Sequence, residues 1–411
     1  MKNLQTNIPD GMRDMVYGEI RVSRELGERL TGLYAARGYT EVVTPTVEYF
    51  NVFDIQNRVI PEEAMFKLID KTGRLIVLRP DNTSAMARIA STRLKNAPRP
   101  IKLCYQQNVF RMPNGYSGKR SEFTQAGIEI IGGKPLLADL ECVSLALDSL
   151  KELCRRFGNP AEETVPKGYQ LEIGHAGFAR ALVDSLELDS DEKQAALDYV
   201  AAKNSSAIEF LSDRHQNIDR AIQLLRRLPR LFGGKEVLER ARALCADVPK
   251  AGETLDYLSE IYALLEKAGL ADRIAIDLSL VHEMEYYTGL VFRGYLEDVG
   301  EAILGGGRYD TLLENFGQAS PATGFGINIS VLADRLAKTI DGEPKPEFLV
   351  CYEPENLSAA LAYLSEAASQ GKIGELSCLD SVEESVAYAE KKGIAGVVRI
   401  CDQNTVQITK V

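Results

Sequence analysis

Three polar side chains lie on a predicted β-hairpin. Residues 101–112 and 121–131 are apolar, alternating segments separated by a polar, glycine-containing loop, a pattern that predicts antiparallel neighbours. Arg111 ends the first segment, and Gln125 and Glu129 lie on the second. Since 125 and 129 are both odd, their side chains point to one face of the strand. A buried glutamate is almost never unpaired, so we expect a ligand pocket here, although Arg111 could instead satisfy a carboxylate of the sheet.

Two further blocks carry side chains that suit a similar ligand. Residues 78–83, LRPDNT, contain Asp81 and Thr83. Residues 280–310 contain YYTGLVF, with Tyr287, and GGGRYD, with Tyr309. Carboxylates pair with an ammonium group or an imidazole N–H, and a tyrosine offers a ring face and a hydroxyl. Residues 305–307 are either a place of close backbone approach or a tight bend.

Together these blocks resemble histidyl-tRNA synthetases, which are class II aminoacyl-tRNA synthetases. The matching regions follow the family's order from the amino terminus to about residue 335, and YYTGLVF followed by GGGRYD is a highly specific part. The resemblance implies an α+β fold, with an antiparallel class II sheet, flanking helices, a helical insertion and a short C-terminal α/β segment. It also implies a histidine site made of seven residues: Asp81, Thr83, Arg111, Gln125, Glu129, Tyr287 and Tyr309. Asp81 stands where the family has glutamate.

The motifs that bind ATP in the synthetase family are altered in this chain. The family's R-x-E-R-P-Q-x-G-R-x-R-x-F loop aligns without a gap to residues 111–123, where Pro113 stands at its glutamate and Asn114 and Ser121 stand at two of its arginines. The arginines of R-G-L-D-Y-Y and of the third motif are also replaced. The substituted positions are Pro113, Asn114, Ser121, His282 and Val331. Amino-acid activation develops charge on phosphate oxygens, and each lost donor costs roughly two to three orders of magnitude in rate. We therefore predict no aminoacylation and no catalytic residues.

A synthetase-like chain with a retained histidine pocket and a broken ATP site is similar to the regulatory subunits of ATP phosphoribosyltransferase, the first enzyme of histidine biosynthesis. That resemblance implies a partner, the short-form catalytic subunit, and L-histidine as a feedback effector. It also implies homodimers, built on the first-motif helix, within a hetero-oligomer. An active histidyl-tRNA synthetase and another class II-like amino-acid-activating enzyme remain as alternatives. The missing arginines argue against both.

The amino-acid composition bears on which partners the protein binds and in which compartment it works. The 411 residues carry a formal net charge of -11, which is weak evidence against tRNA binding. Seven cysteines without a C-x-x-C pair, and three histidines without helical ligand spacing, favour reduced thiols in a cytoplasmic protein with no metal and no cofactor. We find neither an apolar signal core nor a membrane-length apolar segment.

The elements that position these residues follow from periodicity. Residues 20–37 have helical spacing, and TEVVTPTVE predicts a strand interrupted by Pro45. Residues 65–78 predict a hairpin, and residues 83–94 predict a helix. Strands around Leu103, Phe123, Leu171, Ile276, Val291 and Ile327 should form the central sheet. We expect a core domain at 1–335 with a helical insertion at about 178–269, and a C-terminal domain at 345–411 that is shorter than the synthetase anticodon-binding domain.

Overall fold

The structure is a computed structural model of the chain. It describes residues 5–54, 60–112, 120–155, 168–186, 188–204, 206–207, 225–280, 286–297, 299–337, 345–401 and 406–410. The contacts between residues divide the chain into two units, Met1–Ile340 and Asp341–Val411. The substituted positions at 113, 114 and 282 lie outside the described residues.

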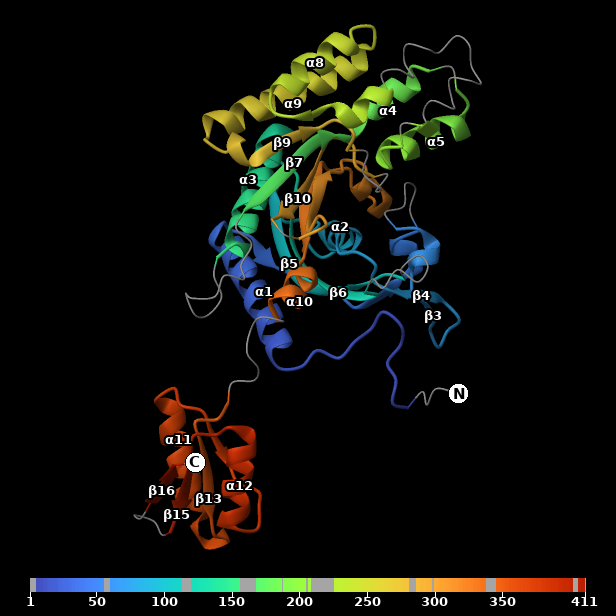
Figure 1. Cartoon of the computed structure of the whole chain (residues 1–411). Coiled ribbons are helices and arrows are strands. Elements are labelled where there is room, and N and C mark those ends of the chain that lie inside the picture. The colour runs from blue at the N-terminus through green and yellow to red at the C-terminus, as the bar shows by residue number, and fades with distance from the viewer. Residues whose placement is uncertain are drawn as a thin grey trace. The chain divides into compact units, whose positions relative to one another are not determined.

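The first unit contains a nine-stranded sheet (Figure 1). The strands in spatial order are β1 (Thr40–Glu41), β5 (Ile101–Phe110), β6 (Glu122–Ile131), β12 (Ala322–Asn328), β11 (Leu304–Arg308), β10 (Leu290–Leu296), β7 (Tyr169–His175), β9 (Ile274–Asp277) and β8 (Phe232–Gly233). All six predicted strand positions are confirmed. The sheet differs from a purely antiparallel one at two pairs, β1 with β5 and β7 with β9, which are parallel. Long connections join the strands of each pair, and such connections permit a parallel crossover.

Helices cover both faces of this sheet, and strand alternation decides which residues they meet. Helices α1 (Gly18–Ala36), α3 (Pro135–Leu153) and α10 (Ile329–Ala337) pack on one face, where Ile128 and Ile130 of β6 are buried in the main core. Helix α2 (Thr83–Ser91) lies over the other face, with Leu103 and Tyr105 of β5 in a second core. Gln125 and Glu129 belong to this second face.

A three-stranded sheet follows α1. Strands β2 (Val47–Tyr49), β4 (Leu75–Leu78) and β3 (Lys67–Ile69) pair in that order, and the side chain of Asp70 accepts hydrogen bonds in the turn between β3 and β4. Glu48 and Val77 face inward and are buried. The opposite face, which we call the apolar small-sheet face, consists of Val47, Tyr49, Leu68, Ile76 and Leu78. None of these five apolar residues is buried.

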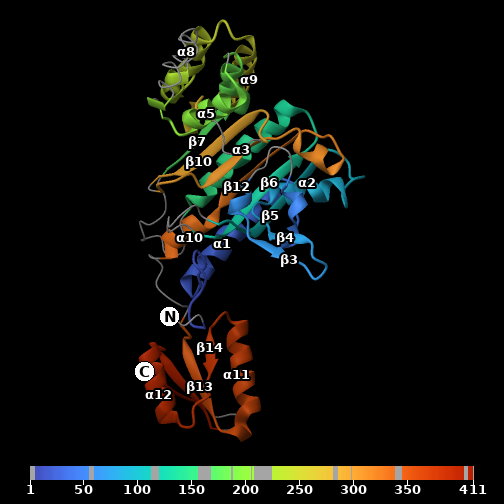
Figure 2. The same cartoon turned by 90° about the vertical axis from the view of Figure 1, so that its right-hand side faces the viewer.

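The chain segment between β7 and β9 forms a helical subdomain (Figure 2). Its helices are α4 (Ala176–Asp184), α5 (Ser190–Ala201), α8 (Glu236–Leu244) and α9 (Pro249–Lys267). Helix α5 begins with a reciprocal capping box in which Asp189 and Glu192 bond to each other's backbone N–H groups. Helix α9 packs on α4 and on α3, so this subdomain shares the main core of the first unit.

The second unit is a four-stranded α/β fold. Strands β14 (Gly374–Leu376), β13 (Phe348–Tyr352), β15 (Gly396–Ile400) and β16 (Val406–Lys410) lie in that order. Helix α11 (Leu357–Ser369) and helix α12 (Val382–Lys392) belong to two separate cores, one on each face of the sheet. The sequence predicted the α/β character of this segment but did not define its short elements β14, α12 and β16. Among the described helices, none has the length and hydrophobicity to cross a membrane.

Candidate functional site

The predicted site residues lie over a glycine floor on the second face of the large sheet. In the strand register, Glu129 lies opposite Gly324, and Gly127 lies opposite Gly326. A Cβ atom on Gly324 would overlap the Glu129 carboxylate, and one on Gly326 would overlap the Gln125 amide. These two glycines therefore allow the side chains of β6 to lie flat across the neighbouring strand, a close approach that no other residue type permits.

Glu129 is the centre of the pocket. Its side chain is only 1% exposed. The Thr83 hydroxyl donates to its Oε1 at 2.9 Å, and the Tyr309 hydroxyl donates to its Oε2. Burial raises the pKa of Glu129 to about 8, although these two hydrogen bonds oppose the rise. Without a ligand, this glutamate is therefore mostly protonated at pH 7.

Asp81 supplies a second acidic group. Its Oδ1 accepts a hydrogen bond of 2.9 Å from the backbone N–H of Ser84, in the first turn of α2. Its Oδ2 is buried and has no hydrogen-bond partner among the described residues. Burial raises the pKa of Asp81, and the positive charge of Arg111 acts in the opposite direction. Since buried polar atoms are nearly always paired, an orphaned acceptor of this kind indicates a place for a donor from a ligand.

Arg111 and Gln125 are fixed at the rim by neighbouring groups. The Nε of Arg111 donates to the carbonyl of Pro80 at 2.7 Å, and its guanidinium lies 5.4 Å from the centre of the Phe123 ring. The Oε1 of Gln125 accepts from the Nδ2 of Asn82 at 3.0 Å. These contacts hold both side chains beside the acidic pair.

Three tyrosines close the pocket. Tyr286, Tyr287 and Tyr309 are all buried; the ring centres of Tyr286 and Tyr287 lie 4.5 Å apart, and those of Tyr286 and Tyr309 lie 5.6 Å apart. Gly307 is part of strand β11, and a Cβ there would come within 2.7 Å of the Tyr287 ring. The glycine run therefore serves close approach of an aromatic ring rather than a bend. Acidic groups and tyrosine rings together suit an amino acid whose side chain is a flat ring with N–H groups.

The seven predicted residues thus lie on five segments that converge on one face of the sheet. Hydrogen bonds link Thr83 and Tyr309 to Glu129, and the positive charge of Arg111 acts to lower the pKa of Asp81. Sequence reasoning missed Asn82 and Gln107, whose side chains bond to each other at 3.2 Å and extend the network from Gln125. Gln107 lies directly opposite Gln125 across the hairpin, so the register could have revealed it. In the described part of the chain, no group of acidic, cysteine and histidine side chains is arranged to hold a metal ion.

At the two described positions of the altered nucleotide motifs, 121 and 331, the side chains are uncharged. Ser121 is buried, and its backbone N–H donates to Gly11 at 2.8 Å, so the N-terminal segment covers it. The adjacent Arg120 forms an ion pair with Asp334 of α10, which also pairs with Arg13 at 2.9 Å. Val331 is an apolar residue on the same helix. Neither position 121 nor position 331 can contribute a cation to a phosphate.

Comparison with known proteins agrees with this fold. The histidyl-tRNA synthetase family profile matches residues 11–332. A solved structure titled histidyl-tRNA synthetase, from Nostoc sp. PCC 7120, covers 98% of this chain with a TM-score of 0.74 at 19% identity, which supports the fold alone. The chain therefore has the class II histidyl-tRNA synthetase fold.

Relatives that match this chain over most of both lengths define its family more specifically. A Clostridium botulinum protein named ATP phosphoribosyltransferase regulatory subunit is 36% identical over 97% of this chain and 92% of its own length. A Bacillus cereus protein of the same name is 33% identical over 97% and 93%. A Bacillus halodurans crystal structure, described as an ATP phosphoribosyltransferase regulatory subunit/histidyl-tRNA synthetase, has a TM-score of 0.84 at 28% identity and covers 97% of this chain and 99% of its own. This chain belongs to the family of ATP phosphoribosyltransferase regulatory subunits.

Proposed function

We propose that this chain is a non-catalytic regulatory subunit that joins a short-form ATP phosphoribosyltransferase catalytic subunit. It supports the first step of histidine biosynthesis and carries the site at which free histidine inhibits that step. The observation that carries the proposal is an intact acidic and aromatic pocket around Glu129, beside Ser121 and Val331, where a synthetase would need cations. Preorganised positive charge is the main means of stabilising a phosphoryl or adenylyl transition state, so such a site favours binding over activation.

The chemistry of the pocket favours histidine among amino acids. The orphaned Oδ2 of Asp81 can accept from the ligand ammonium group, and Arg111 provides a positive charge for its carboxylate. The buried Glu129 can accept from an imidazole N–H, against the ring of Tyr287. An aliphatic amino acid would leave Glu129 buried without a ligand partner, which costs roughly 1 to 3 kcal/mol.

The assembly needs a second copy of the chain. Two copies are proposed to associate through the first-motif region, comprising α1 and the strand region that follows it. The apolar small-sheet face supports this, since Val47, Tyr49 and Leu68 are each more than 40% exposed and lie together on one side of the sheet. Contiguous exposed apolar side chains of this kind are typical of interaction surfaces. The dimers would then join catalytic subunits in a closed, symmetric hetero-oligomer. A cytoplasmic location remains a prediction from the cysteine pattern.

Two binding experiments test the two halves of the proposal. Calorimetric titration of histidine into the isolated chain should give saturable binding, and Glu129→Ala should weaken it by roughly 1.5 to 3 kcal/mol, about 10- to 150-fold. Glu122→Gln, at the start of the same strand but on the opposite face, should bind normally. A short-form phosphoribosyltransferase should co-purify with the native chain. Unchanged affinity in Glu129→Ala would move the effector site elsewhere.

A further inference from the structure

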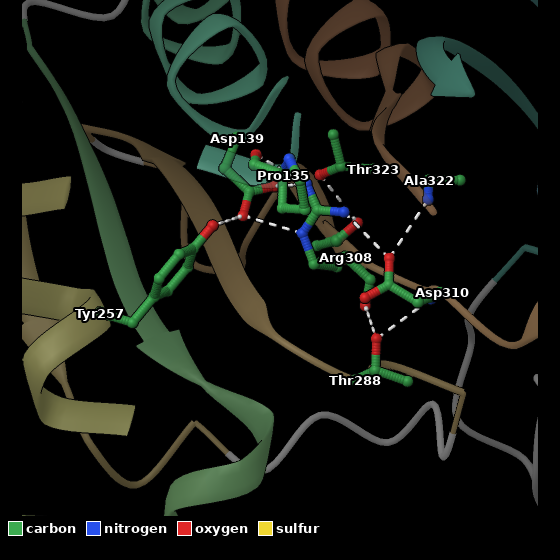
Figure 3. Close-up of polar contacts among 9 residues, drawn as sticks. Pro135, Asp139, Tyr257, Thr288, Arg308, Asp310, Ala322 and Thr323 are labelled. Atoms are coloured by element: carbon green, nitrogen blue, oxygen red, sulfur yellow. Dashed lines mark hydrogen bonds and ion pairs between the residues drawn. The ribbon is translucent and has the colours of Figure 1, made fainter. Parts of the chain in front are cut away.

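A buried ion-paired cluster is centred on Arg308, the residue before Tyr309, and Figure 3 shows its polar contacts. Arg308 of β11 is 4% exposed and binds the Asp139 carboxylate of α3 with two atoms, Nε to Oδ2 at 3.0 Å and Nη2 to Oδ1 at 2.8 Å. Its Nη2 also donates to the carbonyl of Pro135 at 2.8 Å, and its Nη1 donates to Asp310 at 2.9 Å. This geometry uses the planar fork of an arginine, which a lysine cannot reproduce.

The cluster fixes the backbone on both sides of Tyr309 and next to Tyr287. Tyr309 lies between Arg308 and Asp310, and its hydroxyl reaches Glu129. The backbone N–H of Thr288, the residue after Tyr287, donates to the Arg308 carbonyl at 2.8 Å. The Thr288 hydroxyl accepts from the backbone N–H of Asp310 at 3.0 Å. A movement of Arg308 therefore displaces both tyrosines together.

The other end of the cluster reaches the helical subdomain. The hydroxyl of Tyr257, on α9, donates to Oδ2 of Asp139 at 2.6 Å, so this oxygen is shared between Tyr257 and Arg308 (Figure 3). The Tyr257 ring also meets the His175 ring edge to face, with ring centres 6.0 Å apart. Asp139 is fully buried, and a shared buried acceptor transmits a change in one donor to the other.

We infer that Tyr257, Asp139 and Arg308 couple the ligand pocket to helix α9, so that ligand occupancy and the conformation of α9 depend on each other. These three are positioning residues, because they act on the ligand through Tyr287 and Tyr309. The identity of the ligand rests on the function proposed above, whereas the coupling rests on the cluster itself. Such coupling is reciprocal, so a partner that holds α9 in one position changes the affinity of the pocket by the same factor. The cluster therefore links the pocket to the helical subdomain in particular.

Hydrogen exchange with a matched pair of variants tests the coupling. Tyr257→Phe removes the hydroxyl that bonds to Asp139 from a half-buried side chain, while Tyr262→Phe removes a hydroxyl from a buried position on the same helix, α9. In the native chain and in Tyr262→Phe, saturating histidine should slow amide exchange in residues 249–267. In Tyr257→Phe that slowing should be lost, and histidine affinity should fall by about fivefold or more, the lower range of typical coupling. Slowing of equal size in both variants would overturn the inference.

A ligand-free comparison separates this test from the identity of the ligand. Without histidine, Tyr257→Phe should accelerate exchange in residues 304–316, which contain Arg308 and Tyr309, and Tyr262→Phe should not. If the native chain binds no histidine but this difference is present, the proposed effector fails and the coupling stands. If the two variants exchange alike in residues 304–316, the coupling fails whatever the chain binds.

Discussion

Replacing Glu129 with glutamine should make the chain less sensitive to rising pH. Glu129 is 1% exposed, and burial raises its pKa from 4.5 to about 8. In the unfolded chain this group loses its proton near pH 4.5, whereas in the folded chain it keeps the proton until about pH 8. Between these values the folded state binds more protons, so the stability contributed by Glu129 is fully present below pH 4.5 and is lost as the pH rises through 8.

The size of the effect follows from the two pKa values. Each pH unit between them removes about 1.4 kcal/mol of unfolding free energy, and the whole interval is worth on the order of 5 kcal/mol. Glutamine is neutral in both states and removes this dependence. Urea unfolding of the native chain and of Glu129→Gln should therefore give free energies that diverge in favour of the variant as the pH rises from 5 to 8. The control is Glu122→Gln, a half-buried residue of the same strand that bonds to Asn108 at 2.7 Å. Parallel pH profiles for native chain and Glu129→Gln would refute the burial argument.

Three further outcomes are expected. Histidine affinity should rise as the pH increases from 6 to 8, by up to about tenfold per unit, because the ligand pairs best with ionised Glu129, and calorimetry on Glu129→Gln should show a flatter profile. Histidine-dependent exchange of pyrophosphate into ATP should stay at background, since Ser121 and Val331 supply no cation; synthetase-like turnover would instead support an amino-acid-activating enzyme. Leu68→Glu should shift light scattering from twice the 45.3 kDa chain mass toward that mass, whereas Leu137→Glu, at an exposed position of α3, should leave the dimer intact.

Much of the fold was predictable because its signals are local. The apolar spacing of Val22, Leu26 and Leu30 predicted α1, and Gly38, with φ at 82°, follows the C-cap residue Arg37 in the left-handed conformation that favours glycine. The alternation on β6 placed Gln125 and Glu129 on one face, as observed. The C-terminal elements β14 and β16 were missed because short strands take their pairing from distant neighbours rather than from their own pattern.

The candidate site was likewise predictable only in part. The types and motif positions of the seven residues were visible in the sequence, whereas the support behind them was not. Arg308 and Asp139 are 169 positions apart, and Tyr257 is 118 positions from Asp139. No spacing rule relates residues on a strand, a covering helix and an inserted subdomain. Only the packing of α3 between the large sheet and α9 brings these three side chains together.

Regulation by this chain is measured most directly as the rate of N1-(5-phosphoribosyl)-ATP formation by a short-form catalytic subunit. Adding this chain should raise the rate, and histidine should suppress the gain. Glu129→Ala and Tyr287→Ala should relieve the inhibition while the complex persists by light scattering, and Glu122→Gln should remain inhibited. No complex and no change in rate would contradict the account.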